Sequence, residues 1–199
     1  MNERPDKKLL RHHMRQIREE AAARDPGAGE SLADVFPMKL LERYGPVVSG
    51  YVKLNDEIDP APLLKKLAQG GGELALPRVD PDGLISFRAW SHGEPLERGA
   101  FGLAEPAAEA PRVTPTLVLV PALAIDAKGV RLGYGKGHYD RALARLRAEG
   151  RAFACALVYQ AQIIDAVPSE PHDQQMDWAV SERGSTPLFM MNALKQAAS

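Results

Sequence analysis

Residues 116–121 (TLVLVP) form a run that is apolar after its first residue and does not alternate with polar side chains. Strands that are buried on both faces of a parallel sheet have this continuous pattern, whereas strands with one solvated face alternate. Parallel strands must be joined by long crossover connections, which are usually helices. The run therefore restricts the chain to folds in which a mainly parallel sheet is flanked by helices.

The rest of the chain alternates between helical and strand patterns at spacings that suit such a fold. Helix patterns lie at residues 6–23, 31–44 (with Ser31 as the cap), 60–69, 137–149 and 187–197. Strand patterns lie at residues 46–51, 73–77, 84–90, 116–121, 152–159 and 176–181, and residues 94–112 have the weakest secondary-structure signal. The sequence predicts an α/β fold in a single layered domain over residues 1–199.

Composition and charge exclude several classes of protein. Apolar residues make up 45% and charged residues 26% of the chain, which is an ordinary globular balance. Lys plus Arg number 25 against 26 for Asp plus Glu, so no global charge favours nucleic acid or an acidic membrane surface. No window approaches the ~20 apolar residues of a membrane helix, and the charged N-terminus is unlike a secretion signal. The one cysteine, Cys155, lies in an apolar strand pattern and predicts a buried thiol. We expect a cytoplasmic protein.

The first predicted helix carries two distinct faces. One face is an apolar stripe at helical spacing, formed by Leu10, Met14, Ile17 and Ala21. The adjacent face is a basic line with the same spacing, formed by Lys7, Arg11, Arg15 and Arg18. Taken alone, a line of charges on a helix is typical of a solvated face.

A glycine-rich loop between the buried strand and the next helix carries the clearest functional signal. Arg131 is followed by Gly133, Gly135 and Gly137 at alternate positions, with Lys136 among them. Glycines let the backbone approach a ligand closely, and the helix start that follows offers unpaired N–H groups to an anion. The segment therefore predicts a phosphate site at the end of a buried strand, where open parallel sheets bind ligands. Its spacing matches neither the P-loop nor the dinucleotide motif, and a glycine-rich turn without a ligand is the alternative.

The acid and the aromatic residues near this loop each have two interpretations. Asp140, in the first turn of the helix, is stabilised there by ~0.3–1 kcal/mol through the helix dipole without any further function. It can equally hold Mg²⁺, which takes one or two carboxylates together with phosphate oxygens. Tyr134 and Tyr139 either flank a planar ligand or are partly buried residues of the core.

The motifs, taken in order along the chain, resemble the 5-formyltetrahydrofolate cyclo-ligases, also called methenyltetrahydrofolate synthetases. The strongest element is LVPALAIDAKGVRLGYGKGHYDR, at residues 119–141. Shorter matches lie at Lys7-x-x-x-Arg11, residues 51–59, Leu76-Pro77-Arg78, Glu105-Pro106 and residues 168–173 with Asp177 after them. The resemblance implies a Rossmann-like domain in which ATP phosphorylates the formyl oxygen of 5-formyltetrahydrofolate. N10 of the folate then attacks the activated carbon, and 5,10-methenyltetrahydrofolate, ADP and phosphate are released.

The resemblance also implies roles for individual residues. Lys7 and Arg11 correspond to basic ATP contacts on the first helix, and Lys136 and Arg131 are the implied catalytic residues. The ATP loop corresponds to Arg131, Leu132, Gly133, Tyr134, Gly135, Lys136, Gly137, His138 and Tyr139. Many relatives carry Tyr-Tyr-Asp where this chain has His138-Tyr139-Asp140. Position 138 therefore contributes either a group that titrates near neutral pH or a side chain that points outward.

Folate and magnesium positions follow from the same resemblance. The folate positions are Val52, Glu57, Tyr134, Gly135, Lys136, Gly137 and His138. Asp140 and Asp173 correspond to magnesium ligands, although Asp173 alone is typical of a turn acid. Tyr51 and Trp90 offer aromatic surface to the pterin. The implied cofactor is Mg²⁺, with ATP as co-substrate and a reduced folate as substrate.

Partners and rival functions complete these expectations. We expect neither nucleic acid nor membrane as a partner, and a monomer or weak homodimer. The sequence supports neither Ser-His-Asp hydrolysis nor zinc chemistry. Two rivals stay open, namely a folate- or nucleotide-binding module without turnover and a small-molecule kinase that uses the same loop. An ATP-dependent rise in methenyl absorbance excludes the first, and ADP release with a folate-free substrate favours the second.

Overall fold

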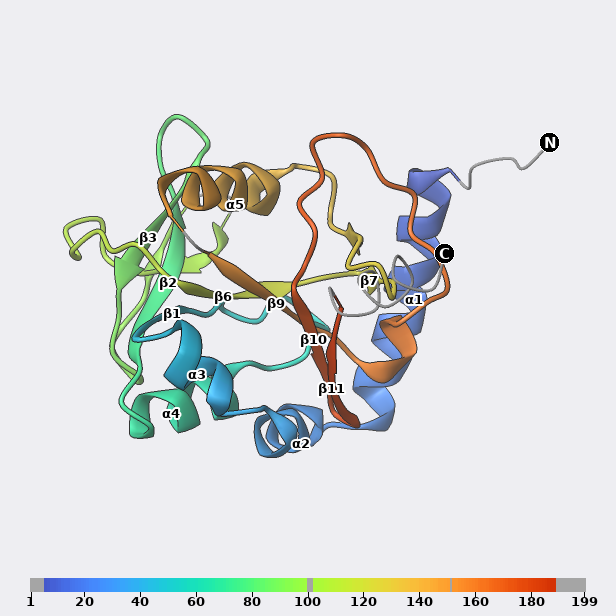
Figure 1. Ribbon diagram of the computed structural model, residues 1–199, viewed down its shortest axis with the longest axis horizontal. Helices are drawn as coiled ribbons and strands as arrows, with labels where there is room; N and C mark the ends of the chain where they lie inside the picture. The colour runs from blue at the N-terminus through green and yellow to red at the C-terminus, as the bar shows by residue number, and fades with distance from the viewer. Residues whose placement is uncertain (1–5, 100–101, 151, 189–199) are drawn as a thin grey trace.

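A seven-stranded sheet forms the centre of the molecule in the computed structural model, which describes residues 6–99, 102–150 and 152–188. The strands lie in the order β11 (Gly184–Pro187), β10 (Trp178–Ser181), β9 (Phe153–Leu157), β6 (Leu117–Pro121), β1 (Val47–Ser49), β2 (Glu73–Val79) and β3 (Ile85–Ala89) (Figure 1). Neighbouring strands are parallel from β10 to β2. The two outermost pairs, β10–β11 and β2–β3, are antiparallel. The predicted α/β class with a mainly parallel sheet is confirmed.

Helices cover both faces of this sheet (Figure 1). Along the chain they are α1 (Lys7–Arg24), α2 (Ala28–Val35), α3 (Lys39–Tyr44), α4 (Ala61–Gln69) and α5 (His138–Glu149), followed by a short 3₁₀ turn, η2 (Gln160–Gln162). In Figure 1, α2, α3 and α4 lie on one side of the sheet, α5 lies on the other, and α1 stands at one end. The part of the chain that the structure describes contains no helix both long and apolar enough to cross a membrane.

The central strand β6 shows why its sequence does not alternate. Leu117 and Leu119 belong to the core beneath α2, α3 and α4, whereas Val118 and Val120 belong to the core beneath α5. All four side chains are fully buried. Cys155 of β9 is also fully buried, and burial raises the pKa of its thiol. A buried two-faced strand and a packed cysteine were both predicted, and both are confirmed.

Two predicted helices need correction. The helix expected over residues 31–44 is divided into α2 and α3, because Pro37 between them has no N–H to donate and disfavours helical geometry at Phe36. Phe36 is extended, with φ −62° and ψ 126°. The helix begins at Ala28 after Gly27, so Ser31 is not its cap. The helix expected from residue 187 is wrong at its start, since Pro187 ends β11, and residues 189–197 lie outside the described part.

Two small hairpins lie outside the main sheet. The weakly predicted region 94–112 contains the antiparallel pair β4 (Glu97–Arg98) and β5 (Ala104–Glu105). A second pair, β7 (Ala124–Ile125) and β8 (Arg131–Leu132), follows β6 directly. The buried carboxylate of Asp126 fixes its turn, accepting hydrogen bonds from the backbone N–H groups of Lys128, Val130 and Val167 at 2.9–3.0 Å.

Most of the apolar stripe of α1 packs on this second hairpin, whereas Ala21 packs against the core beneath α2, α3 and α4. Met14 is buried in a cluster with Leu123 and Leu132, and Leu10 and Ile17 pack against the same cluster. The stripe predicted from the sequence is thus confirmed, and it fixes the first helix beside the segment that leads into the glycine-rich loop.

The strand order has one point at which the direction of the connections reverses, and this point locates the expected ligand site. From β1 the chain crosses through α4 to β2 on one side, whereas β6 pairs with β1 on the other side. In open α/β sheets, ligands bind outside the carboxyl ends of the strands at such a reversal. The loop of residues 50–60 follows β1, and the β7–β8 hairpin follows β6. These two segments therefore border the expected site.

Candidate active site

The glycine-rich loop, residues 133–137, connects β8 to the start of α5. Gly135 and Gly137 have φ values of 97° and 64°, in the left-handed region that favours glycine, and Gly137 is the N-cap of α5. Tyr134, Gly135 and Lys136 are exposed, so the middle of the loop faces solvent just before the helix begins. An exposed loop of this shape, followed by a helix N-terminus, presents N–H groups to an anion.

Two arginines, one from α1 and one from α5, hold the backbone of this loop. The Arg11 side chain donates from Nε to the carbonyl oxygen of Gly133 at 2.9 Å. A Cβ atom at Gly135 would lie 3.3 Å from Cζ of Arg11, so the guanidinium lies directly against the loop. From α5, Arg141 donates Nη1 to the carbonyl oxygen of Lys136 at 2.9 Å. The structure therefore brings the predicted basic residue of α1 to the predicted phosphate loop.

Arg131 is joined to Asp140 rather than exposed beside the loop. Its Nη2 donates to Oδ2 of Asp140 at 2.9 Å, and its Nη1 donates to the carbonyl oxygen of Pro121 at 3.3 Å. The side chains of Arg131 and Asp140 are 6% and 14% exposed. Among the described residues, the buried Nε of Arg131 has no hydrogen-bond partner. The guanidinium thus links the end of β6 to the first turn of α5, and its predicted role in phosphate transfer stays a prediction.

We expect Arg131→Met to lower the free energy of unfolding by about 3–5 kcal/mol, because removing one partner of a buried ion pair leaves the other charge unpaired. Chemical denaturation measures this loss. Arg24→Met is the matched control, since Arg24 forms an exposed pair with Glu20 worth about 0–1 kcal/mol. Equal losses in the two variants would contradict the role given to Arg131.

A second group of charges forms where α1 meets the loop of residues 168–174. The ammonium of Lys7 donates to Glu170 at 2.8 Å and to Asp173 at 2.9 Å. Burial alone raises the pKa of Asp173, but the hydrogen bonds from Lys7 and from the Glu170 N–H bring that pKa below its usual value. Nε2 of His172 lies 3.7 Å from a carboxylate oxygen of each acid. Within the described ranges, Glu170, His172 and Asp173 form a group whose possible ligand atoms all lie within 4.8 Å.

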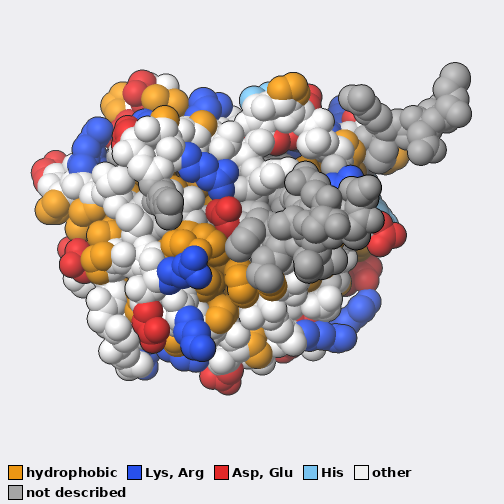
Figure 2. All heavy atoms as spheres, viewed as in Figure 1, with side chains coloured by type: hydrophobic (Ala, Val, Ile, Leu, Met, Phe, Trp, Pro, Cys, Tyr) orange, Lys and Arg blue, Asp and Glu red, His pale blue; other side chains and the backbone are white. Residues whose placement is uncertain are grey.

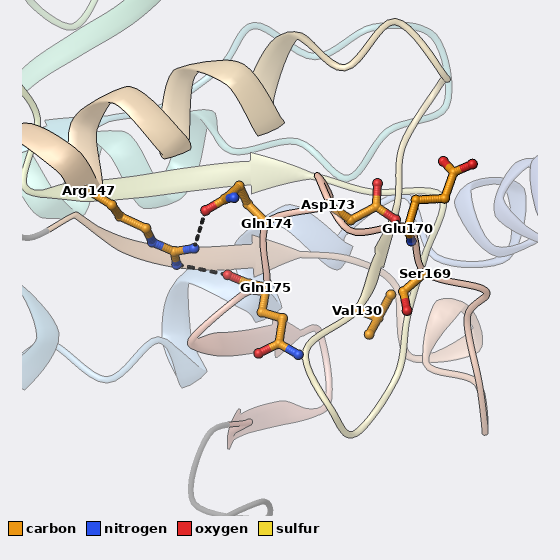
Figure 3. Close-up of a pocket in the computed structure, with 7 residues that line it drawn as sticks. All are labelled: Val130, Arg147, Ser169, Glu170, Asp173, Gln174 and Gln175. Carbon is orange, nitrogen blue, oxygen red and sulfur yellow. Dashed lines mark hydrogen bonds between the residues drawn. The ribbon is translucent and has the colours of Figure 1, made fainter.

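The two predicted magnesium ligands lie on segments that touch. The N–H of Gln174, which follows Asp173, donates to Oδ1 of Asp140 at 3.1 Å. A cavity of about 310 Å³ opens beside Asp173, lined by Val130, Arg147, Ser169, Glu170, Asp173, Gln174 and Gln175 (Figure 3). Figure 3 shows Arg147 reaching across to Gln174 and Gln175, which fixes this loop to α5. Glu170 was not predicted, although its position three residues before Asp173 in a proline-bounded loop is a usable signal.

The predicted folate acid, Glu57, lies in a buried polar network. It is 4% exposed, and its Oε1 accepts a hydrogen bond of 2.8 Å from the hydroxyl of Tyr134. Its Oε2 accepts from the N–H of Leu54 at 3.0 Å. The network continues to Arg18, which is 2% exposed and donates to the Tyr134 hydroxyl and to both carboxylate oxygens of Asp56. The interpretation of the whole basic line as a solvated face is therefore wrong for Arg18.

Of the remaining aromatic and apolar candidates, some are exposed near the site and the others lie in the core or away from the site. Tyr134 is 37% exposed at the site, whereas Tyr139 packs against the core beneath α5. Tyr51 is 4% exposed and donates its hydroxyl to the carbonyl oxygen of Ile58, so it is a core residue. Trp90 follows β3 and donates its backbone N–H to the carbonyl oxygen of Leu74, near the start of β2. It therefore lies at the end of the sheet opposite the carboxyl ends of the parallel strands, away from this site. Val52 is 37% exposed in the loop after β1.

Burial and the neighbouring charges of Arg141 and Lys136 lower the pKa of His138. We therefore expect the imidazole to be neutral at neutral pH and to titrate below the ordinary value of about 6.5. An NMR titration of the ring protons, assigned with a His138→Gln variant, measures this. A midpoint at or above the ordinary value would contradict the expected environment.

Charges are mixed over the visible face of the molecule (Figure 2), so neither sign of charge dominates it. The positive charge beside the loop comes from the local basic residues described above. Their arrangement suits a ligand with a compact negative charge.

Comparison with known proteins points to one family. The sequence profile of the 5-formyltetrahydrofolate cyclo-ligase family matches residues 3–182. The chain is 36% identical over 143 residues to the cyclo-ligase of Mycolicibacterium smegmatis, covering 66% of this chain and 71% of that protein. It is 27% identical over 172 residues to that of Haemophilus influenzae, covering 82% and 91%. The structure of Aquifex aeolicus 5,10-methenyltetrahydrofolate synthetase superposes with a TM-score of 0.74 at 28% identity over 92% of both chains.

Proposed function

Because the chain belongs to the 5-formyltetrahydrofolate cyclo-ligase family, a family of ligases, we propose that it converts 5-formyltetrahydrofolate to 5,10-methenyltetrahydrofolate with hydrolysis of ATP to ADP and phosphate. One observation carries the proposal beyond the family. The glycine-rich loop, suited to phosphate, is joined through Tyr134 to Glu57, the acid predicted to contact the folate. The phosphate donor and its acceptor would thus meet at the same loop.

The chemistry explains why a phosphate loop belongs in this reaction. A formyl amide is a poor electrophile, and its oxygen is a poor leaving group. Attack of the formyl oxygen on the γ-phosphorus forms an O–P bond and releases ADP. N10 then bonds to the formyl carbon, the carbon–oxygen bond breaks, phosphate leaves with that oxygen, and N10 loses its proton. For phosphoryl transfer the protein must mainly align the two reactants and neutralise the charge on the phosphates.

The phosphate side of the proposed site consists of basic groups and N–H groups. Gly135 and Lys136 are exposed just before the start of α5, and the first N–H groups of a helix have no partner within the helix. Arg11 lies against the loop, and Lys7 lies one turn earlier on the same helix. We assign Lys136 to the transferred phosphoryl group, where a full positive charge stabilises the charge that develops in the transition state.

The donors at Asp140 and Asp173 fit Mg²⁺, because carboxylate oxygens beside a phosphate site are the ligands that this cation takes. The contact between Gln174 and Asp140 keeps their two segments together. When bound, the ion would neutralise charge on the phosphates. Asp140 and Asp173 would hold it, and Arg131 would fix the orientation of the Asp140 carboxylate through the bond to Oδ2.

The direct test is incubation of the purified chain with 5-formyltetrahydrofolate, ATP and Mg²⁺, with each omitted in turn. We expect methenyl absorbance to rise only in the complete mixture, with one ADP formed per methenyl product. ADP release without methenyl absorbance, or absorbance without ATP, would contradict the proposed reaction.

A further inference from the structure

Arg18 ties three segments together from a buried position on α1. Its Nε and Nη2 donate to the two carboxylate oxygens of Asp56, each at 2.9 Å. Its Nη1 donates to the hydroxyl of Tyr134, and the same nitrogen lies 3.7 Å from Oε1 of Glu57. All parts of the guanidinium are therefore engaged, in contacts that join α1 to the loop after β1 and to the glycine-rich loop.

A buried arginine at this position calls for an explanation beyond stability. Removing charges from water costs several kcal/mol per ion, and a hydrophobic replacement for a buried ion pair is often equally stable or more stable. The side chain of Arg18 lies against the polar groups of Asp56, Glu57 and Tyr134. An apolar replacement would leave these groups without their partner, so the charge and the planar fork of donors are what this position supplies.

We propose that Arg18 is a positioning residue for the folate side of the site. It aligns the Tyr134 hydroxyl so that this hydroxyl donates to Glu57, and it keeps Glu57 in the carboxylate form that meets the substrate. This inference rests on the proposed function. The phosphate side has its own supports, because Arg11 and Arg141 hold the carbonyl oxygens of Gly133 and Lys136.

The charges around Glu57 predict the direction in which each substitution should shift the pKa of Glu57, and that direction can be tested. Burial raises the pKa of Glu57, and hydrogen bonds from Tyr134 and the Leu54 N–H together with the charge of Arg18 oppose that rise. The charge of Asp56 adds to the rise. Among the residues that the structure describes, the titratable and charged groups that face Glu57 are Arg18 from α1, Asp56 from its own loop, Tyr134 from the glycine-rich loop, Tyr51 after β1 and Tyr139 from α5.

The two charged neighbours should therefore act in opposite directions. Arg18→Met removes the cation that favours the carboxylate, so the acid limb of kcat/KM for 5-formyltetrahydrofolate should move to higher pH. Asp56→Asn removes an anion that disfavours the carboxylate, so the same limb should move to lower pH. Arg18→Met should also lower kcat/KM by about 10²-fold, the scale of a small misalignment of reacting groups.

Three further measurements make the experiment specific. Binding of Mg·ATP, measured by calorimetry, should be unchanged in Arg18→Met, because Arg11 and Arg141 still hold the phosphate loop. Arg18→Lys keeps the charge but not the fork of donors, so it should restore the acid limb while kcat/KM recovers only in part. Arg24→Met, on the exposed end of the same helix, should match the wild type in its acid limb, its kcat/KM and its binding of Mg·ATP.

An acid limb that stays fixed in both variants, or moves the same way in both, would overturn the role of Arg18. If Arg18→Met does not fold, the limb in Asp56→Asn decides alone, and a limb that stays in place or moves to higher pH sinks the proposal. A wild-type protein that forms no methenyl product would instead refute the proposed function, which separates the two failures.

Discussion

Replacing Lys136 with alanine is expected to keep the fold and to lower turnover by at least ~10²-fold, the scale of losing one electrostatic donor at a reacting centre. Lys136 is exposed in the glycine-rich loop. Its carbonyl oxygen accepts the hydrogen bond from Arg141, and alanine preserves that bond. The change therefore removes a charge from the phosphate site while the loop keeps its hydrogen bond to Arg141.

Initial rates of methenyl formation at saturating substrates measure the effect, and a thermal melt checks the fold. Lys65→Ala is the matched control, because Lys65 is an exposed lysine on α4, which covers the opposite face of the sheet from α5. It should retain wild-type turnover. Near-normal turnover in Lys136→Ala would remove this lysine from the mechanism.

Asp140→Asn is expected to raise the magnesium concentration needed for half-maximal activity by about 10–100-fold, a loss seen even for residues that only support a metal ligand. Asparagine has the same shape and retains an oxygen for Arg131 or for the Gln174 N–H. It lacks the negative charge that a hard cation prefers in its ligand. The loss should therefore appear in the magnesium titration more than in the rate at saturating magnesium.

The control for this variant is Glu149→Gln, which removes an exposed acid at the other end of the same helix. Its magnesium titration should match that of the wild type. Denaturation of both variants without magnesium separates any loss of the Arg131 contact from the loss of metal affinity. An unchanged titration in Asp140→Asn would reduce Asp140 to an acid that fixes Arg131 at a helix start.

Local patterns predicted the elements that define the fold. The continuous run in β6 indicated a strand covered on both faces, and Leu117 and Val118 indeed face different cores. The glycine-rich loop and the helix after it were also predicted, because glycine conformation and helix starts are encoded within a few residues. The apolar stripe of α1 predicted a packed face, although not that the β7–β8 hairpin would be its partner.

Features that depend on distant contacts were not predictable in the same way. Arg18 has the same helical spacing as the exposed Arg15, and only the approach of Asp56 and Tyr134 makes it buried. Likewise, Arg131 looks like a phosphate ligand until the first turn of α5 brings Asp140 to its guanidinium. Neither contact follows from spacing, because both join segments that tertiary packing brings together.

The fate of the formyl oxygen tests the proposed chemistry most directly. We would incubate the protein with Mg·ATP and 5-formyltetrahydrofolate that carries a heavy oxygen isotope in the formyl group, and then analyse the released phosphate by mass spectrometry. If the formyl oxygen is phosphorylated and leaves with the phosphorus, each methenyl product should yield one labelled phosphate. Unlabelled phosphate, with the isotope found in water, would show that ATP is cleaved without touching the folate.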